Sequence, residues 1–434
     1  MIKRILYTLL IMFPVLASAQ INTDRVMAIG RNALYFEDYV LSIQYFNQVI
    51  NAKPYLSDPY FYRGLAKINL DDFQGAESDC SEAIERNPFV VSAYQVRGLA
   101  RIQQNNFAGA IEDYTKALEF DPENIGVWHN MALCRIRQED YKGAKNDLDK
   151  LIAISPRYTK AYLMRGEVDL KQKDTLAAEK DFGKAIEIDR YDADTWASRA
   201  ILRLQQQRYK DAEADFDHAI RLSTRNSGVY INRALARYHQ NNLRGAMSDY
   251  DIALDIDPNN FIGHYNQGLL RAQVGDDNRA IQDFNFVIEM EPDNMMAIFN
   301  RGLLLDQTGD YKGAIKDYST VINEYPNFLL GYQYRAQARR KIGDVKGADA
   351  DEFKVLKAQL DKQNGVDPNK QTADNTENNK TRKKSDKNMN NYRKIVVADN
   401  EEGEEKYKSD YRGRVQDKNV NIVPQPMFVL TYYE

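Results

Sequence analysis

Apolar side chains recur along most of this chain at the three- and four-residue spacing of amphipathic helices, and the whole pattern returns every 34 residues. One small residue marks each repeat, and the full set is Gly30, Gly64, Gly98, Ala132, Gly166, Ala200, Ala234, Gly268, Gly302 and Ala336. The frame holds from residue 23 to residue 362 without insertion or deletion, which gives ten units. They start at residues 23, 57, 91, 125, 159, 193, 227, 261, 295 and 329, and positions below are counted within the unit.

Each unit predicts two helices joined by a turn. Position 16 is Asp or Asn in nine units, which suits the N-cap of a second helix because a short side-chain oxygen can accept from free backbone N–H groups. A proline at position 32 then ends the second helix, because it has no N–H and clashes with the preceding turn. The prolines at this position are Pro54, Pro88, Pro122, Pro156, Pro258, Pro292 and Pro326.

Small residues at positions 8 and 20, an aromatic residue at 24, Ala at 27 and Pro at 32 resemble the tetratricopeptide repeat (TPR). The resemblance covers about 340 of the 434 residues. It implies an all-α solenoid, a right-handed superhelix of ten helical hairpins in which the first helix of each hairpin lines the concave face. The chain departs from the family at positions 7 and 11, where arginine often replaces the usual Leu and Tyr.

The arginines follow a rule that is visible within the one chain. Arg stands at position 7 in seven units and at position 11 in six, and Asp stands at position 23 in nine. Every unit with that Asp has an Arg at position 7, at position 11 or at both, and these two positions lie one helical turn apart. We predict structural bridges between the two helices of a unit, and a ladder of arginines for anionic ligands is the competing interpretation. The predicted pairs include Arg63–Asp79, Arg97–Asp113, Arg165–Asp181 and Arg301–Asp317.

The groove should be lined by positions 2, 6, 9 and 13, because the other faces of the first helix are directed at helix neighbours. In units seven to ten these positions form an apolar strip beside a row of amides. An amide both donates to and accepts from a peptide backbone, so we predict a site for an extended peptide. The predicted residues are Asn232, Asn266, Asn300, Leu235, Leu269, Leu303, Ile262, Met296, Leu330, His239, Gln273 and Gln307.

The asparagines at position 6 resemble the asparagine ladders by which some TPR superhelices hold extended peptides. The alternative is purely structural, because Asn is common at this position in the family and Leu at position 9 can pack on the next unit.

The two ends of the chain differ from the repeats. Residues 1–19 have the pattern of a signal peptide, with a charged start, an apolar stretch and the small-residue cleavage site Ala17-Ser18-Ala19. We expect export to the bacterial periplasm or cell envelope, with an uncleaved anchor as the alternative, and no later stretch is apolar enough to span a membrane. Residues 363–392 are predicted to be a disordered linker. Residues 393–434 are β-prone, and they either add a strand to a partner or continue further in nature.

Composition excludes several functions. Acidic and basic residues are interspersed and the net charge is −4, so no clustered basic face for nucleic acid is predicted. Cys80 and Cys134 are expected to be buried thiols. The four histidines occupy four different positions of the unit without metal-ligand spacing, and no catalytic or phosphate-binding motif is present. We therefore predict no catalytic residue, no metal and no cofactor.

These observations predict an exported, non-enzymatic scaffold that binds an extended segment of a protein partner in its concave groove. The alternative is a structural component of a cell-envelope complex that docks through its C-terminal segment. The partner, the pathway and the oligomeric state are not indicated by the sequence.

Overall fold

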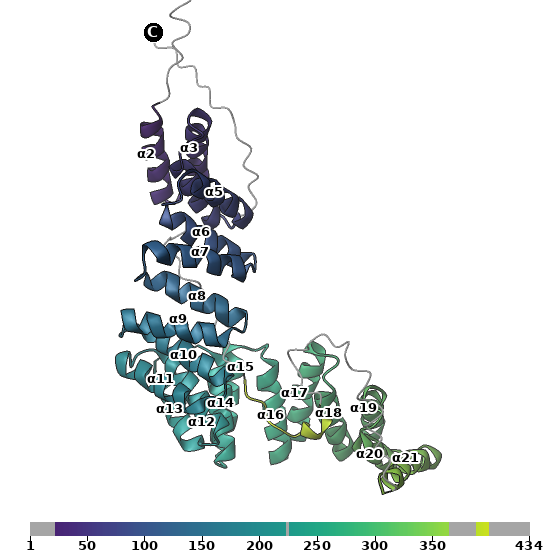
Figure 1. Cartoon of the computed structure of the whole chain (residues 1–434). Helices are drawn as coiled ribbons and strands as arrows, with labels where there is room; N and C mark the ends of the chain where they lie inside the picture. The colour runs from purple at the N-terminus through teal and green to yellow at the C-terminus, as the bar shows by residue number, and fades with distance from the viewer. Residues whose placement is uncertain (1–21, 223–224, 364–387, 399–434) are drawn as a thin grey trace, which may run out of the picture. The chain divides into compact units, whose positions relative to one another are not determined.

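A computed structural model describes residues 22–222, 225–363 and 388–398. Within these residues the chain forms twenty α-helices and one short 3-10 helix, and no strand (Figure 1). The helices pair into one hairpin per unit, as the sequence predicts. Their bounds are α2 (Thr23–Tyr35), α3 (Tyr39–Ala52), α4 (Asp58–Asn69), α5 (Phe73–Arg86), α6 (Val91–Gln103), α7 (Phe107–Phe120), α8 (Ile125–Arg137), α9 (Tyr141–Ile154), α10 (Thr159–Lys171), α11 (Thr175–Ile188), α12 (Ala193–Gln205), α13 (Tyr209–Arg221), α14 (Ser227–His239), α15 (Leu243–Ile256), α16 (Phe261–Val274), α17 (Asp277–Met290), α18 (Met295–Thr308), α19 (Tyr311–Glu324), α20 (Leu329–Lys341), α21 (Val345–Gln363) and η3 (Met389–Asn391).

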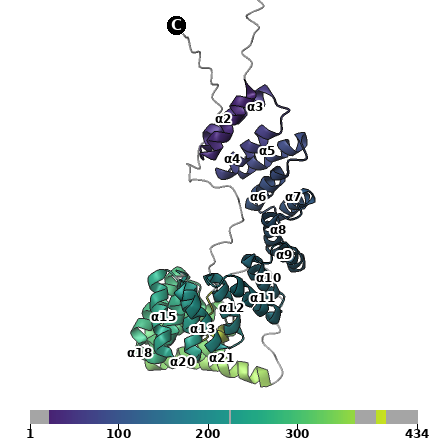
Figure 2. The same ribbon diagram turned by 90° about the vertical axis from the view of Figure 1, so that its left-hand side faces the viewer.

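The hairpins belong to two compact parts, which are described separately. The first part contains α2 to α11, and the second part contains α12 to α21 together with residues 388–398. Within each part the two helices of a hairpin pack on each other, and the second helix also packs on the first helix of the next hairpin (Figure 2). This is the predicted α-solenoid arrangement. None of the described helices is both long enough and apolar enough to cross a membrane.

The core of each hairpin depends on the small and aromatic positions of the repeat. In the α18–α19 hairpin, a Cβ atom added to Gly302 would lie only 2.9 Å from the ring of Tyr318, so the two helices approach closely here. The aromatic residue at position 24 is almost completely buried, and burying such a side chain contributes about 2–3 kcal/mol. Cys80 and Cys134 are buried free thiols, which confirms the prediction.

The second helix of each hairpin begins with the predicted cap in most units. In α19 the side chain of Asp310 accepts from the backbone N–H of Gly313 at 3.0 Å. Eight of the nine predicted Asp or Asn caps make the equivalent bond, and Asp276 does not. The residue just before the cap has a left-handed backbone in every unit. Only three of these residues are glycine, and the set is Glu37, Asp71, Asn105, Glu139, Lys173, Gln207, Asn241, Gly275, Gly309 and Gly343.

The C-terminal region differs from its prediction where the structure describes it. Residues 388–391, assigned from the sequence to a disordered linker, include the 3-10 turn η3. Residues 393–398, assigned to a β-prone segment, form no strand; the backbone groups of Val396 and Ala398 bond to side chains of the solenoid instead. The predicted signal peptide, most of the linker and residues 399–434 lie outside the described residues.

Candidate peptide-binding groove

The arginines at position 7 bridge the two helices of a hairpin. In Arg301, Nε and Nη2 donate to the two carboxylate oxygens of Asp317, each at 2.7 Å. The Asp side chain is only 4% exposed, and the arginine is 22% exposed. The other predicted pairs have closest N–O distances of 2.6–2.7 Å, and they are Arg63–Asp79, Arg97–Asp113 and Arg165–Asp181. These guanidinium groups are thus bonded to carboxylates of the scaffold itself.

The remaining guanidinium nitrogen reaches the preceding hairpin. Nη1 of Arg301 donates to the side-chain oxygen of Asn285 at 2.9 Å, and Asn285 lies at position 25 of the previous unit. The equivalent bonds are Arg63 to Asn47, Arg97 to Ser81, Arg165 to Asp149, Arg233 to Asp217 and Arg335 to Ser319. Each of these arginines therefore joins three helices. The bridge within a hairpin could be predicted from the sequence, whereas the bond between hairpins was not predicted.

Burial affects the pKa of three of the carboxyl groups at position 23. Burial raises the pKa of Asp113 and of Asp249, although arginines at positions 7 and 11 partly offset the effect. Asp147 belongs to the unit with Met131 at position 7, so only Arg135 faces it, with a closest distance of 2.7 Å. Burial raises the pKa of Asp147 to about 6, and the single arginine offsets only part of the shift.

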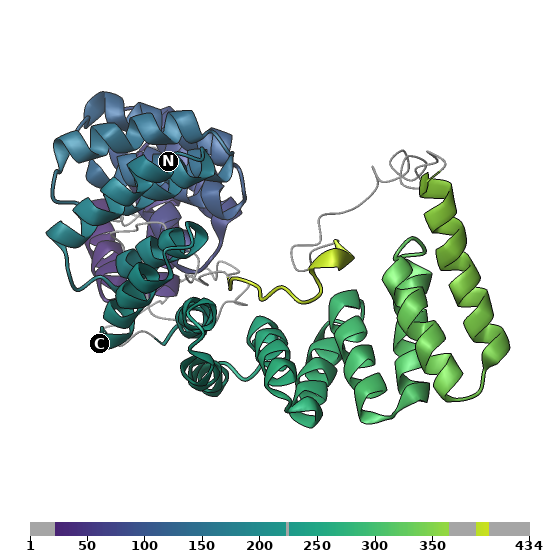
Figure 3. The ribbon, with the colours of Figure 1, turned by 90° about the horizontal axis from the view of Figure 1, so that it is seen from below.

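The asparagine row, defined as Asn232, Asn266 and Asn300, lies on α14, α16 and α18 and is buried. It is covered by the bound segment, residues 388–398, which Figure 3 shows in yellow beside the helices of the second part. Asn266 donates from Nδ2 to the carbonyl oxygen of Val396 at 2.7 Å and accepts from the Val396 N–H at 2.9 Å. Asn232 makes the same two bonds to Ala398, at 3.0 and 2.9 Å.

The third asparagine holds the start of the extended stretch. Asn300 Nδ2 donates to the carbonyl oxygen of Tyr392 at 2.6 Å, and the hydroxyl of Tyr265 donates to the same oxygen at 2.8 Å. The Tyr392 ring packs edge-on against Phe299, with ring centroids 4.8 Å apart. The bound segment thus runs from α18 towards α14, opposite to the order of the helices in the chain.

The row recognises the main chain rather than side chains. At Val396 and Ala398 both backbone polar groups are satisfied by one amide, and any residue except proline offers the same pair of groups. The two residues are two apart, so the backbone groups facing the solenoid repeat with the period of an extended strand. The arrangement is therefore suited to an extended peptide of variable sequence.

Side chains of the bound segment enter three environments. Tyr392 packs on the hydrophobic cluster that includes Phe299 and Phe328. Ile395 packs against the cluster that includes Leu235, and Ala398 is buried in the cluster that includes Ile231. In contrast, Val396 and Val397 are 42% and 38% exposed. We call Tyr392, Ile395 and Ala398 the anchors of the segment. They are spaced three residues apart, and solvent-facing residues lie between them.

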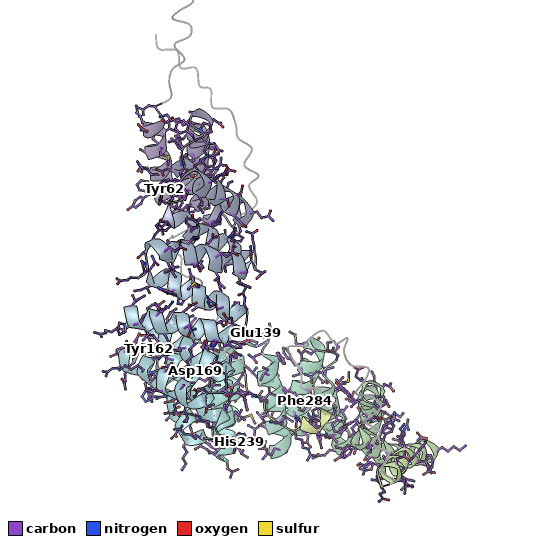
Figure 4. All side chains as sticks on the ribbon, in the orientation of Figure 1. Tyr62, Glu139, Tyr162, Asp169, His239 and Phe284 are labelled. Carbon is purple, nitrogen blue, oxygen red and sulfur yellow. The ribbon has the colours of Figure 1, made fainter. Side chains whose placement is uncertain are left out.

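A cavity of about 360 Å³ remains beside the bound segment. The segment contributes Arg393 and Ile395 to its wall, and α18 contributes Leu303 and Leu304. The other lining residues are Tyr238, Leu269, Ala272, Gln273, Phe284, Asn300 and Gln307. Phe284 is labelled in Figure 4.

Most of the predicted site residues are brought together at this surface. Leu269, Leu303, Gln273 and Gln307 line the cavity. Leu235 and Ile262 belong to the clusters that Ile395 and Ala398 meet.

The remaining predicted residues support the groove or lie apart from it. Met296 and Leu330 pack in the same cluster as Tyr392, and the Met296 carbonyl accepts from Asn300 at 2.9 Å. His239, labelled in Figure 4, is exposed and stacks on the Tyr209 ring with centroids 4.5 Å apart. Its ring contacts are with Tyr209 and Tyr238, so its role in binding stays a prediction.

Three aromatic residues at the groove were missed. Tyr265 and Phe299 are at position 5 and Tyr238 is at position 12, which helical periodicity directs at helix neighbours rather than into the groove. Tyr265 and Phe299 nevertheless contact Tyr392, and Tyr238 lines the cavity. The sequence gives an indication of this, because two of the three Phe or Tyr residues at position 5 stand beside members of the asparagine row, and only Phe61 lies elsewhere.

Among the described residues, no group of three or more His, Cys, Asp and Glu side chains could hold a metal ion.

Comparison with known families identifies repeats along much of the chain. A family model described as TPR repeat matches residues 98–134, and models described as tetratricopeptide repeat match residues 125–158, 159–192, 198–261 and 265–327. These matches together span more than half of the chain. The chain belongs to the tetratricopeptide repeat family.

Solved structures similar to this TPR chain have low sequence identity to it. A tetratricopeptide repeat protein from Parabacteroides merdae is 20% identical, with 57% of this chain and 98% of that chain covered and a TM-score of 0.46. The C-terminal part of a TPR repeat-containing protein from Cytophaga hutchinsonii is 17% identical, with 55% and 97% covered and a TM-score of 0.46. YrrB, described as a TPR protein with an unusual peptide-binding site, is 18% identical, with 42% and 95% covered and a TM-score of 0.39. No curated protein matches the chain in sequence.

Proposed function

We propose that this TPR protein is an adaptor whose groove on α14, α16 and α18 binds an extended segment of a partner protein. The fold supports a protein-interaction scaffold in general. The observation that carries the specific proposal is the pair of two-way bonds from Asn232 and Asn266 to backbone groups two residues apart. Such bonds give affinity for main chain, and the neighbouring apolar clusters give preference among side chains.

The bound segment then has the role of a tethered occupant. It covers the asparagine row, so a partner segment and residues 392–398 compete for the same bonds. Without any occupant, the amides of Asn232 and Asn266 would lose four hydrogen bonds to the segment and would bond to water instead. The groove is thus closed by the chain itself until a partner replaces the segment.

The groove is tested by adding the segment as a separate peptide. The probe is a labelled, end-capped peptide with the sequence of residues 388–398. It is titrated into the full chain carrying Tyr392→Ala and Ile395→Asp, which weaken the tethered copy. We expect saturable binding that falls at least ten-fold when Asn232→Ala and Asn266→Ala are added, because each loses a two-way contact of about 1–2 kcal/mol.

Asn130→Ala is the matched control for this experiment. Asn130 is also buried at position 6, but it belongs to α8 in the first part, whereas the bound segment belongs to the second part. It should leave peptide binding unchanged. Binding that persists in the Asn232→Ala, Asn266→Ala variant would show that the asparagine row does not hold extended peptides.

A second candidate function is assembly of an envelope complex through the C-terminal segment. It is favoured by the fact that residues 393–398 make backbone-directed contacts that another TPR groove could also offer. The two functions differ in the effect of deleting residues 388–434. Deletion opens the groove and strengthens partner binding in the adaptor function, whereas it abolishes association in the assembly function.

We also propose that the protein is exported to the periplasm or cell envelope. The support is the charged start, apolar stretch and Ala17-Ser18-Ala19 site of residues 1–19. N-terminal sequencing of the protein from its native cell should give a mature chain that begins near Gln20. A chain that retains its first residues and fractionates with the cytoplasm would contradict export.

A further inference from the structure

The bound segment leaves the cavity beside it unfilled. At about 360 Å³ it is far larger than the space that one water molecule needs. Ile395 lines it without filling it, although the residue is otherwise packed against the cluster of Leu235. An extended peptide that keeps the same backbone bonds could therefore place a larger side chain at the register of Ile395.

The walls of the cavity indicate which kind of side chain would fit. One group of lining residues is apolar, and it includes Leu269, Leu303 and Phe284. The other group is polar: the Tyr238 hydroxyl donates to the Gln273 side-chain oxygen at 2.8 Å, and Gln307 also faces the space. An aromatic side chain with a polar tip matches this combination, since its ring buries apolar surface and its N–H or O–H finds an amide or hydroxyl partner.

We propose that the partner's segment carries a tyrosine or tryptophan at the register of Ile395, and that this side chain fills the cavity. The inference rests on the proposed function, because it assumes that a partner uses the backbone bonds of the asparagine row. The other two anchors keep the chemistry of the bound segment. They are an aromatic residue three positions earlier, against Phe299, and a small residue three positions later, where Ala398 is only 3% exposed.

A preference of the cavity for an aromatic side chain explains how a partner segment can replace the bound segment of the chain itself. Both peptides satisfy Asn232 and Asn266 through their main chains, so the asparagine row does not distinguish between them. The side chain in the cavity does distinguish them. Burying roughly 50 Å² of additional apolar surface would strengthen binding about ten-fold.

The experiment uses the labelled peptide of residues 388–398 and the full chain with its tethered copy weakened by Tyr392→Ala and Ile395→Asp. Peptides carrying Ile395→Trp or Ile395→Tyr should bind about ten-fold more tightly than the unchanged peptide. The matched control peptide carries Lys394→Tyr, because Lys394 is exposed and does not line the cavity. It should bind like the unchanged peptide.

The same substitution placed in the chain itself should act in the opposite direction. Ile395→Trp in an otherwise unaltered full chain should weaken binding of the added unchanged peptide about ten-fold, because the tethered copy now competes better. Equal binding of the Ile395→Trp, Ile395→Tyr and Lys394→Tyr peptides would overturn the cavity proposal while leaving groove binding intact. Failure of every peptide to bind would instead overturn the proposed function, and the inference with it.

Discussion

Replacing Arg301 by methionine should destabilise the α18–α19 hairpin by about 3 kcal/mol. The change removes both guanidinium bonds to Asp317, whose carboxylate is only 4% exposed. Position 11 of this unit is Leu305 rather than arginine, so no second guanidinium replaces the lost one. Breaking a buried ion pair by removing one partner typically costs about 3–5 kcal/mol, and the lower end applies here because Arg301 is 22% exposed.

The chain contains its own control for this argument. In the α14–α15 hairpin, Asp249 is bonded by Arg233 and also by Arg237, whose Nη1 lies 2.8 Å from the carboxylate. Arg233→Met should therefore cost only about half as much as Arg301→Met, since one guanidinium stays. Arg233 also lies over the Tyr230 ring at 5.6 Å, and Arg233→Met removes this contact as well. The extra loss would make Arg233→Met more costly, so a smaller cost for Arg233→Met than for Arg301→Met can only come from the second arginine.

Hydrogen exchange resolved along the chain measures both effects, because repeat arrays open hairpin by hairpin as well as globally. Amides of α19 in Arg301→Met and of α15 in Arg233→Met are each compared with the unaltered chain. The double variant Arg301→Met, Asp317→Leu should return to within about 1 kcal/mol of the original opening free energy, because the stranded charge is gone. Equal losses in the two single variants, or no recovery in the double variant, would refute the reasoning.

Three further predictions concern single hairpins. The Tyr318 hydroxyl is buried without a hydrogen-bond partner among the described residues, so Tyr318→Phe should leave the melting temperature unchanged or raise the stability by up to about 1 kcal/mol; a clear loss would reveal an unseen partner. Lys173 has a left-handed backbone with φ of 65°, so Lys173→Gly should stabilise by about 1 kcal/mol in denaturant titrations, and Gly309→Lys, at the same position of its unit, should destabilise by a similar amount. The pKa of Asp147 is raised to about 6 in the folded chain and is near 3.9 when unfolded, so the native state holds this proton more tightly. The contribution of Asp147 to stability should therefore fall as the pH rises from about 4 to about 6. Met131→Arg, which supplies a second arginine, should reduce this contribution, so thermal melts of the two proteins should differ in their pH dependence; an identical slope in both proteins would contradict the assignment.

The hairpins could be predicted from the sequence because their determinants repeat. A short Asp such as Asp310 caps a helix in the same way in each unit, and Gly302 allows the same close approach to an aromatic ring. The turn just before the cap escaped prediction for the opposite reason. Its left-handed backbone is imposed by the packing of the two helices, so residues such as Lys173 and Glu139 adopt it although their side chains do not favour it.

The asparagine row could also be predicted, whereas its occupant could not. Asn232 and Asn266 stand at one position of the unit, and an amide can bond to both polar groups of a peptide backbone. The bound segment leaves no corresponding pattern, because the contacts at Val396 and Ala398 are made by the main chain and require no particular side chain. Tyr265 was missed because helical periodicity alone directs position 5 along the stack, while a long aromatic side chain can still reach the groove.

In the proposed function, tethering of the bound segment makes the side chain in the cavity decisive for the choice of partner. Residues 388–398 follow α21 by only 24 residues, and a linker of this order gives an effective concentration of roughly 1 mM. A partner that makes the same contacts as the bound segment must approach that concentration to displace half of it. A ten-fold gain from an aromatic side chain lowers the requirement to roughly 0.1 mM, and a second gain of equal size elsewhere lowers it to roughly 10 μM. Because the asparagine row serves both occupants equally, selection depends on the residue that meets Leu269 and Leu303.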